Sequence, residues 1–275
     1  MTEQKAFKYP VPGPIELKKI TAIVYGVYGG MGANSYFILG KSGVTVIDAK
    51  MTEDFGKAVV AEIKKTTDMP ITRMIITHSD LDHVNGLSGF PQGMEILSST
   101  KTRSEMYSEF EKSGFDVLMR YLPNETYDNE KELDLGGLTA RLYHAAPAHT
   151  GGDTIVYLPA QKTAFVGDLV FMGRPPLIHG LKGGTSTGLV KSLKFLLTLD
   201  CEHYLSGHAS PVGKNEVETL LNYVESVRAR VIALKAQGKS LDDVKRELNV
   251  IEMEMPPGRP RFPMLEEVVY GEEQK

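Results

Sequence analysis

The 275-residue chain contains a single cysteine, Cys201. One cysteine cannot build an internal disulfide framework or a cysteine-based zinc site. Long hydrophobic runs are missing too, because none reaches the roughly 18 residues of a membrane-spanning helix. The polar, proline-rich stretch MTEQKAFKYPVPGP does not resemble a signal segment. We therefore expect a cytoplasmic protein with no membrane partner.

An excess of one charge sign is also missing, since the net charge at pH 7 is −4. This balance argues against nucleic acid or an anionic membrane as a partner, and a small-molecule substrate is expected instead. Hydrophobic residues make up 41% of the chain and charged residues 24%, as is ordinary for a globular protein. A chain of this length can fold as one large α/β domain.

Short runs rich in Val, Ile, Tyr and Phe alternate with helical patterns, which is typical of an α/β fold. The predicted strands are 20–28, 34–40, 43–49, 71–77, 95–99, 138–145, 154–160, 162–168 and 201–208. The predicted helices are 52–67, 100–112, 189–198, 214–237 and 240–248. Thr52 is a candidate N-cap, and Ser240 with Asp243 resembles a capping box.

These patterns divide the chain into three parts. We expect a loose N-terminal arm over 1–19, one catalytic domain over 20–237, and a C-terminal helix and tail over 238–275. The tail contains apolar residues such as Phe262 in an irregular segment. It is predicted to cap the active site or to contact a second subunit in a homodimer.

Metal-binding side chains follow several of the predicted strands. The segment THSDLDHVNG, residues 77–86, comes directly after a buried strand, and HTGGDT, FVGD and SGH mark three more strand ends. The donors in these segments are His78, Asp80, Asp82, His83, His149, Asp168 and His208. If the strands lie side by side, their ends converge at one edge of a sheet. A solvated polar turn is the alternative for HSDLDH, but such a turn does not explain donors at three further strand ends.

Imidazole and carboxylate ligands without a thiolate suit zinc, iron or manganese. Seven donors are too many for one tetrahedral ion and suit two. The sequence therefore predicts a dinuclear metal site.

The same motifs, in this order across about residues 20–210, resemble those of the metallo-β-lactamase superfamily, which includes glyoxalase II, lactonases, zinc β-lactamases and ribonuclease Z. The resemblance implies an αββα sandwich, an α/β fold with the site at one edge. It implies one metal position at His78, residue 80 and His149, and a second at Asp82, His83 and His208. Asp168 would bridge the two ions.

Position 80 departs from the usual motif of this superfamily, His-x-His-x-Asp-His, because Asp80 replaces the second histidine. An aspartate oxygen lies as many bonds from Cα as the nearer ring nitrogen of histidine, so Asp80 can reach the ion. The alternative is that Asp80 faces solvent or another polar group and leaves the first position weak. If Asp80 binds, the site carries one positive charge fewer, which would raise the pKa of bound water and weaken capture of anionic substrates.

We predict a metal-dependent hydrolase in which a metal-bridging hydroxide attacks an ester, thioester, lactone or phosphoester. Its cofactors would be two divalent metal ions, with zinc favoured and iron or manganese as alternatives. Asp82 and Asp168 are the predicted catalytic carboxylates. Two alternatives stay open: a di-iron protein that binds or reduces O₂, related to flavodiiron proteins that carry a glutamate at position 80, and a non-catalytic binding member.

Further polar residues lie near the predicted site in the sequence. His179 and Arg174, in the long loop 173–188, are candidates for substrate binding or for plain exposure. Lys182 in that loop could bind an anionic group, although charged loop residues are usually solvated. Asp48 ends a strand, and we interpret it as a structural residue or as support for a ligand from behind.

Overall fold

Two β-sheets form the centre of the molecule, which we describe from a computed structural model over residues 13–250 and 261–272. The first sheet has the order β1-β2-β3-β4-β5-β6-β7. Its strands are β1 Glu16–Lys19, β2 Val24–Tyr28, β3 Ser35–Leu39, β4 Val44–Ile47, β5 Ile71–Ile75, β6 Glu95–Ser99 and β7 Glu125–Tyr127. The second sheet has the order β12-β11-β10-β9-β8. Its strands are β8 Glu130–Asp134, β9 Thr139–His144, β10 Thr154–Leu158, β11 Thr163–Gly167 and β12 His203–Ser206.

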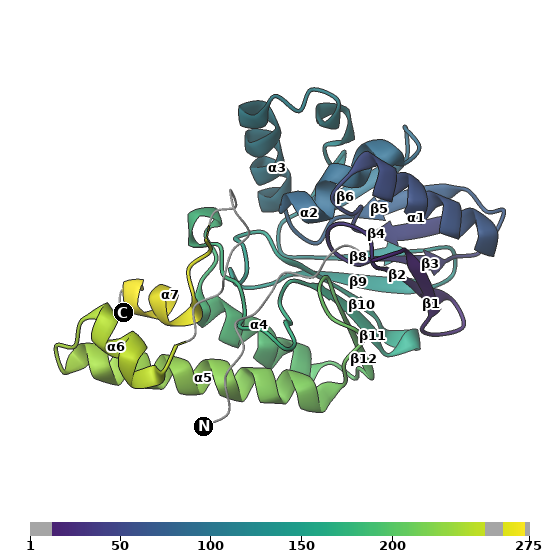
Figure 1. Ribbon diagram of the computed structural model, residues 1–275. Coiled ribbons are helices and arrows are strands. Elements are labelled where there is room, and N and C mark those ends of the chain that lie inside the picture. Colours follow the sequence, from purple (N-terminus) through teal and green to yellow (C-terminus); the bar gives the residue numbers. More distant parts are fainter. Residues whose placement is uncertain (1–12, 251–260, 273–275) are drawn as a thin grey trace.

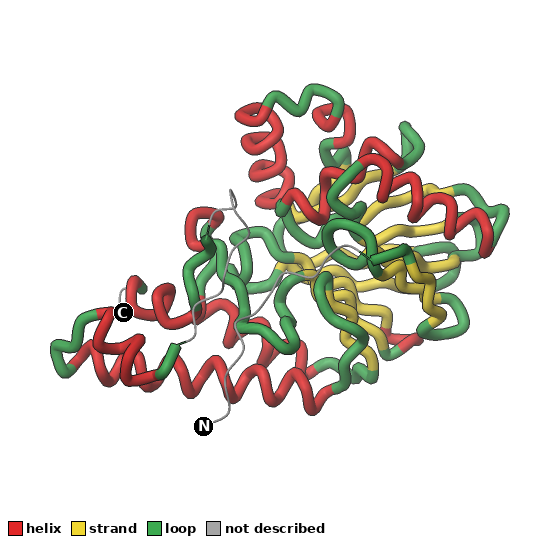
Figure 2. The backbone as a smooth tube through the Cα atoms, viewed as in Figure 1, coloured by secondary structure: helices red, strands yellow, loops and turns green. Residues whose placement is uncertain are grey.

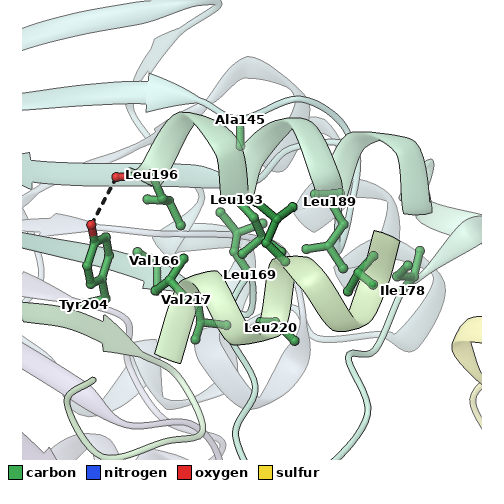
Figure 3. Close-up of a cluster of buried hydrophobic side chains, with 14 of the residues drawn as sticks. Ala145, Val166, Leu169, Ile178, Leu189, Leu193, Leu196, Tyr204, Val217 and Leu220 are labelled. Atoms are coloured by element: carbon green, nitrogen blue, oxygen red, sulfur yellow. Dashed lines mark hydrogen bonds between the residues drawn. The ribbon is translucent and has the colours of Figure 1, made fainter. Parts of the chain in front are cut away.

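Helices cover the outer face of each sheet (Figure 1). The described helices are α1 Glu53–Thr66, α2 Leu81–Val84, α3 Thr100–Ser113, α4 Ser186–Thr198, α5 Lys214–Ala236, α6 Leu241–Leu248 and α7 Leu265–Gly271. Val59 and Ile63 of α1, with Met106 and Phe110 of α3, pack on the first sheet. Helices α4 and α5 pack on the second sheet. Figure 3 shows this second outer core, in which Leu189, Leu193 and Leu196 of α4 meet residues of α5.

A third apolar cluster lies between the two sheets. Ile38, Ile47 and Ile75 of the first sheet contact Val156 and Phe165 of the second sheet within this cluster. Met74 and Ile75 at the end of β5 and Ile76 directly after it are fully buried and form a continuous apolar run, as expected where a strand is covered on both faces. The order of layers is therefore helix, sheet, sheet, helix, and the predicted αββα sandwich is confirmed.

Local signals set several element boundaries. The Thr52 hydroxyl accepts a hydrogen bond from the Phe55 amide at 3.3 Å, which confirms the N-cap of α1. The Ser240 hydroxyl accepts from the Asp243 amide at 3.2 Å, and Asp243 Oδ2 accepts from the Ser240 amide at 3.1 Å. This reciprocal pair confirms the capping box at the start of α6. The strands predicted at 34–40 and 43–49 form a hairpin, because β3 and β4 pair antiparallel across the turn that contains Gly43.

Other expectations need correction. Residues 16–19 are not part of a loose arm, because β1 pairs antiparallel with β2. The first long strand begins at Val24 rather than at residue 20, since the Thr21 hydroxyl accepts from the Val24 amide and forms a turn there. Strands β7 and β8 and helix α7 lie in stretches for which the sequence predicted no regular structure. Residues 1–12, 251–260 and 273–275, which include most of the predicted arm and part of the tail, lie outside the described residues.

Across the two described ranges, no helix combines the length and the apolar character that crossing a membrane requires.

Replacing Leu193 with alanine tests the outer core of the second sheet. Leu193 is fully buried between α4 and its neighbours, so the loss of its side chain should lower the free energy of unfolding by about 2–5 kcal/mol. Urea denaturation followed by circular dichroism measures this change. Leu181→Ala is the matched control, because Leu181 is exposed, and its effect should stay within about 0.5 kcal/mol. Equal stability of the two variants would contradict the packing of α4.

Candidate metal centre

The predicted donors meet at the edge where the loops after β5, β9, β11 and β12 come together. Loops gather at this end of the strands in Figure 2. Three overlapping groups have donor atoms within 4.8 Å of one another. The groups are His78, Asp80 and His149; His78, His83 and Asp168; and Asp82, His83 and His208. The structure thus brings all seven predicted donors together, while their role as metal ligands stays a prediction.

Asp80 faces the histidines of the first group. Asp80 Oδ2 lies 3.0 Å from His149 Nε2 and 3.9 Å from His78 Nε2. All three residues are buried, so Asp80 does not face solvent, while its other oxygen, Oδ1, contacts the polar groups of Lys182 and His179. A carboxylate in this place can serve as a donor without any movement of the loop.

Asp168 belongs to the group with His78 and His83 and lies between the first group and the third. Its Oδ2 is 3.7 Å from His149 Nε2 and 3.3 Å from His208 Nε2, while its Oδ1 is 3.2 Å from His83 Nε2. His208 Nε2 also lies 3.1 Å from Asp82 Oδ2. Asp168 therefore reaches histidines of both groups, as its predicted bridging position requires.

Hydrogen bonds behind the site orient His83 and His78. Asp48 Oδ2 lies 2.7 Å from His83 Nδ1, and a carboxylate can only accept, so His83 donates through Nδ1. The Thr77 hydroxyl donates its hydrogen to Asp48 Oδ2 at 2.7 Å. The hydroxyl oxygen of Thr77 is therefore left to accept a hydrogen bond from His78 Nδ1 at 3.0 Å. With Nδ1 protonated, the Nε2 atom of each neutral ring carries a lone pair that faces the site.

His149 is oriented in the same way by the backbone. Its Nδ1 donates to the carbonyl of Leu177 at 2.8 Å, which leaves Nε2 as the acceptor nitrogen of the neutral ring. Within the described part of the chain, three buried atoms at the centre have no hydrogen-bond partner: His78 Nε2, His83 Nε2 and Asp168 Oδ1. His83 Nε2 and Asp168 Oδ1 are close, yet their geometry is not that of a hydrogen bond. Buried polar atoms are normally satisfied, so unpaired acceptor atoms facing one another fit a bound cation.

The electrostatics of the cluster agree with this fit. Burial disfavours the charged form of His83, but the carboxylates of Asp168 and Asp48 outweigh burial and raise the pKa of His83 well above its ordinary value. Burial also opposes the charged form of His149, and Asp80 outweighs it and raises the pKa of His149 to about 9. The carboxylates thus attract positive charge into the interior, which a divalent ion would supply.

Asp48 also has an unusual backbone conformation. Its φ is 57°, in the left-handed region that a residue other than glycine rarely adopts. Strain of this kind persists where surrounding contacts hold it, and here the Thr77 amide donates to Asp48 Oδ1 at 2.8 Å. The sequence interpretation of Asp48 as support for a ligand agrees with its contact to His83.

Gly207 is a site residue that the sequence analysis missed. A Cβ atom at this position would lie 2.4 Å from Asp168 Oδ1 and 2.6 Å from His83 Cε1. Any side chain would therefore displace two donors. The only signal in the sequence is that Gly207 directly precedes His208.

The outer side of Asp80 has partners that the sequence did not predict. Lys182 is not solvated, because its Nζ lies 2.8 Å from Asp80 Oδ1 and its side chain is only 22% exposed. His179 Nδ1 lies 3.1 Å from the same oxygen. The positive charge of Lys182 offsets the negative charge of Asp80, so the loss of one positive charge expected at the site is compensated.

Arg174 lies beside the third donor group, that of Asp82, His83 and His208, rather than at the first. Its guanidinium is 4.1 Å from the centroid of the Phe171 ring, and that ring stacks on His208 at 5.7 Å. Substrate binding by Arg174 and His179 stays a prediction.

A family model described as the metallo-β-lactamase superfamily matches residues 28–208 of the chain. The chain belongs to this superfamily. The match runs from the end of β2 to His208 and so includes all seven donors.

Proteins similar in sequence to this chain are named for different activities. A 2,4-dinitroanisole O-demethylase subunit alpha from Nocardioides is 26% identical over 183 residues, which cover 64% of this chain and 53% of that protein. A metallo-β-lactamase type 2 from Elizabethkingia meningoseptica is 26% identical over 179 residues, which cover 63% of this chain and 69% of that protein. The chain therefore spans about half the length of the demethylase subunit.

A solved structure of the stereoselective inverting sec-alkylsulfatase Pisa1 from Pseudomonas has a similar fold. Its TM-score to this chain is 0.73 at 16% sequence identity, and the match covers 93% of this chain and 47% of that one. At such low identity the likeness shows the fold alone.

Replacing Asp48 with asparagine tests the support behind His83. The amide cannot replace the negative charge that holds the His83 ring, so the affinity for the ion bound by His83 should fall about 10- to 100-fold. Competition between the protein and a coloured zinc chelator measures this affinity.

Asp54→Asn is the matched control, because Asp54 is an exposed carboxylate in the first turn of α1. Metal affinity of Asp48→Asn equal to that of this control would show that Asp48 does not support the centre.

Proposed function

We propose that the protein is a metal-dependent hydrolase in which the seven donors hold two divalent ions. The observation that supports this proposal is the position of Asp168, whose Oδ2 lies within 4.0 Å of His78 Nε2 and 3.3 Å of His208 Nε2. One carboxylate can thus contribute to both predicted metal positions. Divalent ions held in this way lower the pKa of bound water and polarise the oxygen of a substrate.

The residues around the donors would keep the centre rigid. Asp48 fixes the ring of His83, and the Leu177 carbonyl fixes the ring of His149. Preorganised ligands need no rearrangement during the reaction, which favours catalysis.

Exposure of the donors indicates the side from which a substrate approaches. The side chains of His78 and His149 are 1% exposed, whereas those of His208 and Asp82 are 22% and 30% exposed. A substrate would therefore reach the centre from the side of His208, where Phe171 and Arg174 also lie. This placement supports the assignment of Arg174 as a substrate-binding residue.

The substrate class that we propose is an ester, thioester, lactone or phosphoester. Similar proteins named for a β-lactam, a sec-alkyl sulfate and 2,4-dinitroanisole extend the set of compounds to be tested. A first panel therefore contains p-nitrophenyl esters and phosphoesters, a thioester, a lactone, an alkyl sulfate and a β-lactam.

A redox role for two iron ions is the second candidate. Asp80 supports it, because an additional carboxylate shifts the preference of a site from zinc toward harder ions such as iron or manganese. Elemental analysis of protein purified without added metal separates the candidates, together with its visible spectrum. About two zinc ions and no colour would support the hydrolase, and two iron ions with an oxo-bridge absorption would favour O₂ chemistry.

Removal of the metal tests the need for it directly. Dialysis against a strong chelator should abolish hydrolysis of the best substrate of the panel, and about two equivalents of zinc per chain should restore it. Circular dichroism before and after dialysis shows whether the fold survives. Full activity of folded, metal-free protein would exclude the proposed function.

Replacing Asp168 with alanine tests the shared carboxylate. Because Asp168 contacts histidines of both donor groups, the variant should lose about one ion per chain and nearly all turnover. The measurements are elemental analysis and initial rates on the same substrate panel.

Asp200→Ala serves as a control, since the Asp200 carboxylate is 79% exposed at the surface. An Asp168→Ala protein that kept both ions and its activity would refute this arrangement. Two bound ions without turnover on any compound of the panel would instead favour a non-catalytic binding protein.

A further inference from the structure

All three donors of the Lys182 ammonium are directed at neighbouring residues. Lys182 Nζ lies 2.8 Å from Asp80 Oδ1, 3.2 Å from Ser79 Oγ and 3.3 Å from the Ser79 carbonyl oxygen. Ser79 can accept this bond because its own hydroxyl donates to Glu105 Oε2 at 2.7 Å. An ammonium group has three N–H donors, so Lys182 has none left for a substrate. Lys182 therefore acts on Asp80, to which it makes its shortest contact.

His179 is the second residue that contacts Asp80 Oδ1. Its Nδ1 is 3.1 Å from Asp80 Oδ1. The His179 ring stacks on the ring of His149 at 5.1 Å and on the ring of Phe262 at 4.7 Å. Two aromatic contacts of this kind restrict rotation of the imidazole.

These contacts leave Asp80 with only one oxygen for the donor group. Oδ1 is held by Lys182 and His179, while Oδ2 lies 3.0 Å from His149 Nε2. A histidine at position 80 would also present one atom to the metal and would carry no charge. Asp80 matches such a histidine in two ways. Its contacts leave one oxygen available, and the charge of Lys182 balances its own charge.

The backbone ties this arrangement to the loop that carries His149. The His179 amide donates to the His149 carbonyl at 2.7 Å, and the Gly151 amide donates to the Lys182 carbonyl at 2.7 Å. The Lys182 amide in turn donates to the His179 carbonyl at 3.0 Å. Residues 179–182 and 149–151 are therefore held together as one unit.

We propose that Lys182, His179 and Phe262 form a clamp that makes Asp80 a one-oxygen ligand of the first metal ion. The clamp rests on the metal-dependent function proposed above. Lys182 and His179 act through Asp80 and are positioning residues, and Phe262 supports His179. The clamp explains how a carboxylate serves at a position where the superfamily usually has a histidine.

Cobalt substitution of the full-length protein tests the clamp. The intensity of visible cobalt absorption falls when the coordination number rises, so it reports whether Asp80 binds through one oxygen or two. Lys182→Met removes the charged and shorter of the two contacts to Oδ1, so this oxygen can turn toward the ion and the absorption of the first position should fall. Lys182→Arg should keep the absorption, because arginine still donates to Oδ1. Lys57→Met, which removes an exposed lysine of α1, is the matched control.

The decisive comparison uses the background Asp80→His, in which no second oxygen needs to be held. Lys182→Met should leave the cobalt spectrum unchanged in that background. An unchanged spectrum of Lys182→Met in the native background, or the same change in both backgrounds, would overturn the clamp. Wild-type protein that binds no cobalt would overturn the proposed function instead, so the two failures are distinct.

Phosphate binding tests the charge of the clamp. Inorganic phosphate titrated into the cobalt proteins should bind Lys182→Met about tenfold more weakly than wild type, because one nearby positive charge is lost. Asp80→His combined with Lys182→Met should return to within about threefold of wild type, since the two charge changes cancel. Equal phosphate affinity of Lys182→Met and wild type would overturn the compensation.

Phe262→Leu covers the case in which Lys182→Met does not fold. Leucine keeps apolar contact with His179 and loses the flat stacking surface, so the spectral change should have the same direction and a smaller size. A spectrum identical to wild type would remove Phe262 from the clamp.

Discussion

Carboxylates buried against imidazoles are the constraint on which the rest of this structure depends. Asp48 and Asp168 are almost fully inaccessible, and an unpaired charge in that environment is costly. Each carboxylate is matched by hydrogen-bond donors or by a histidine, and the loops that carry them are fixed from behind. The two sheets serve this requirement, because they bring strand ends from distant parts of the chain to one edge.

The same constraint accounts for position 80. Replacing a neutral ring by an anion inside the cluster would increase the repulsion between like charges. Lys182 supplies the opposite charge within hydrogen-bond distance, and His179 supplies a second donor. The surrounding loop, rather than the donor motif itself, makes this residue compatible with the site.

The donors were predictable from the sequence, and so was Asp48 behind His83, whereas the partners of Asp80 were not. Strands 71–75 and 163–167 contain short apolar runs, and a donor follows each strand within three residues, so the pattern located both the elements and the edge where they end. Strand β7 has only three residues and α7 only seven, too few for a periodic pattern. Lys182 lies in a charged loop whose contact with Asp80 spans a sequence separation of 102 residues, and no local pattern encodes such a contact.

The contact between Phe262 and His179 changes how the working unit of this protein is defined. The superfamily match ends at His208, while Phe262 lies well beyond it, just before α7. A segment without any donor therefore contacts a residue that lies against Asp80. Divergence in such a segment can alter the chemistry of the centre while every donor stays the same, so relatives with identical donors need not be equivalent.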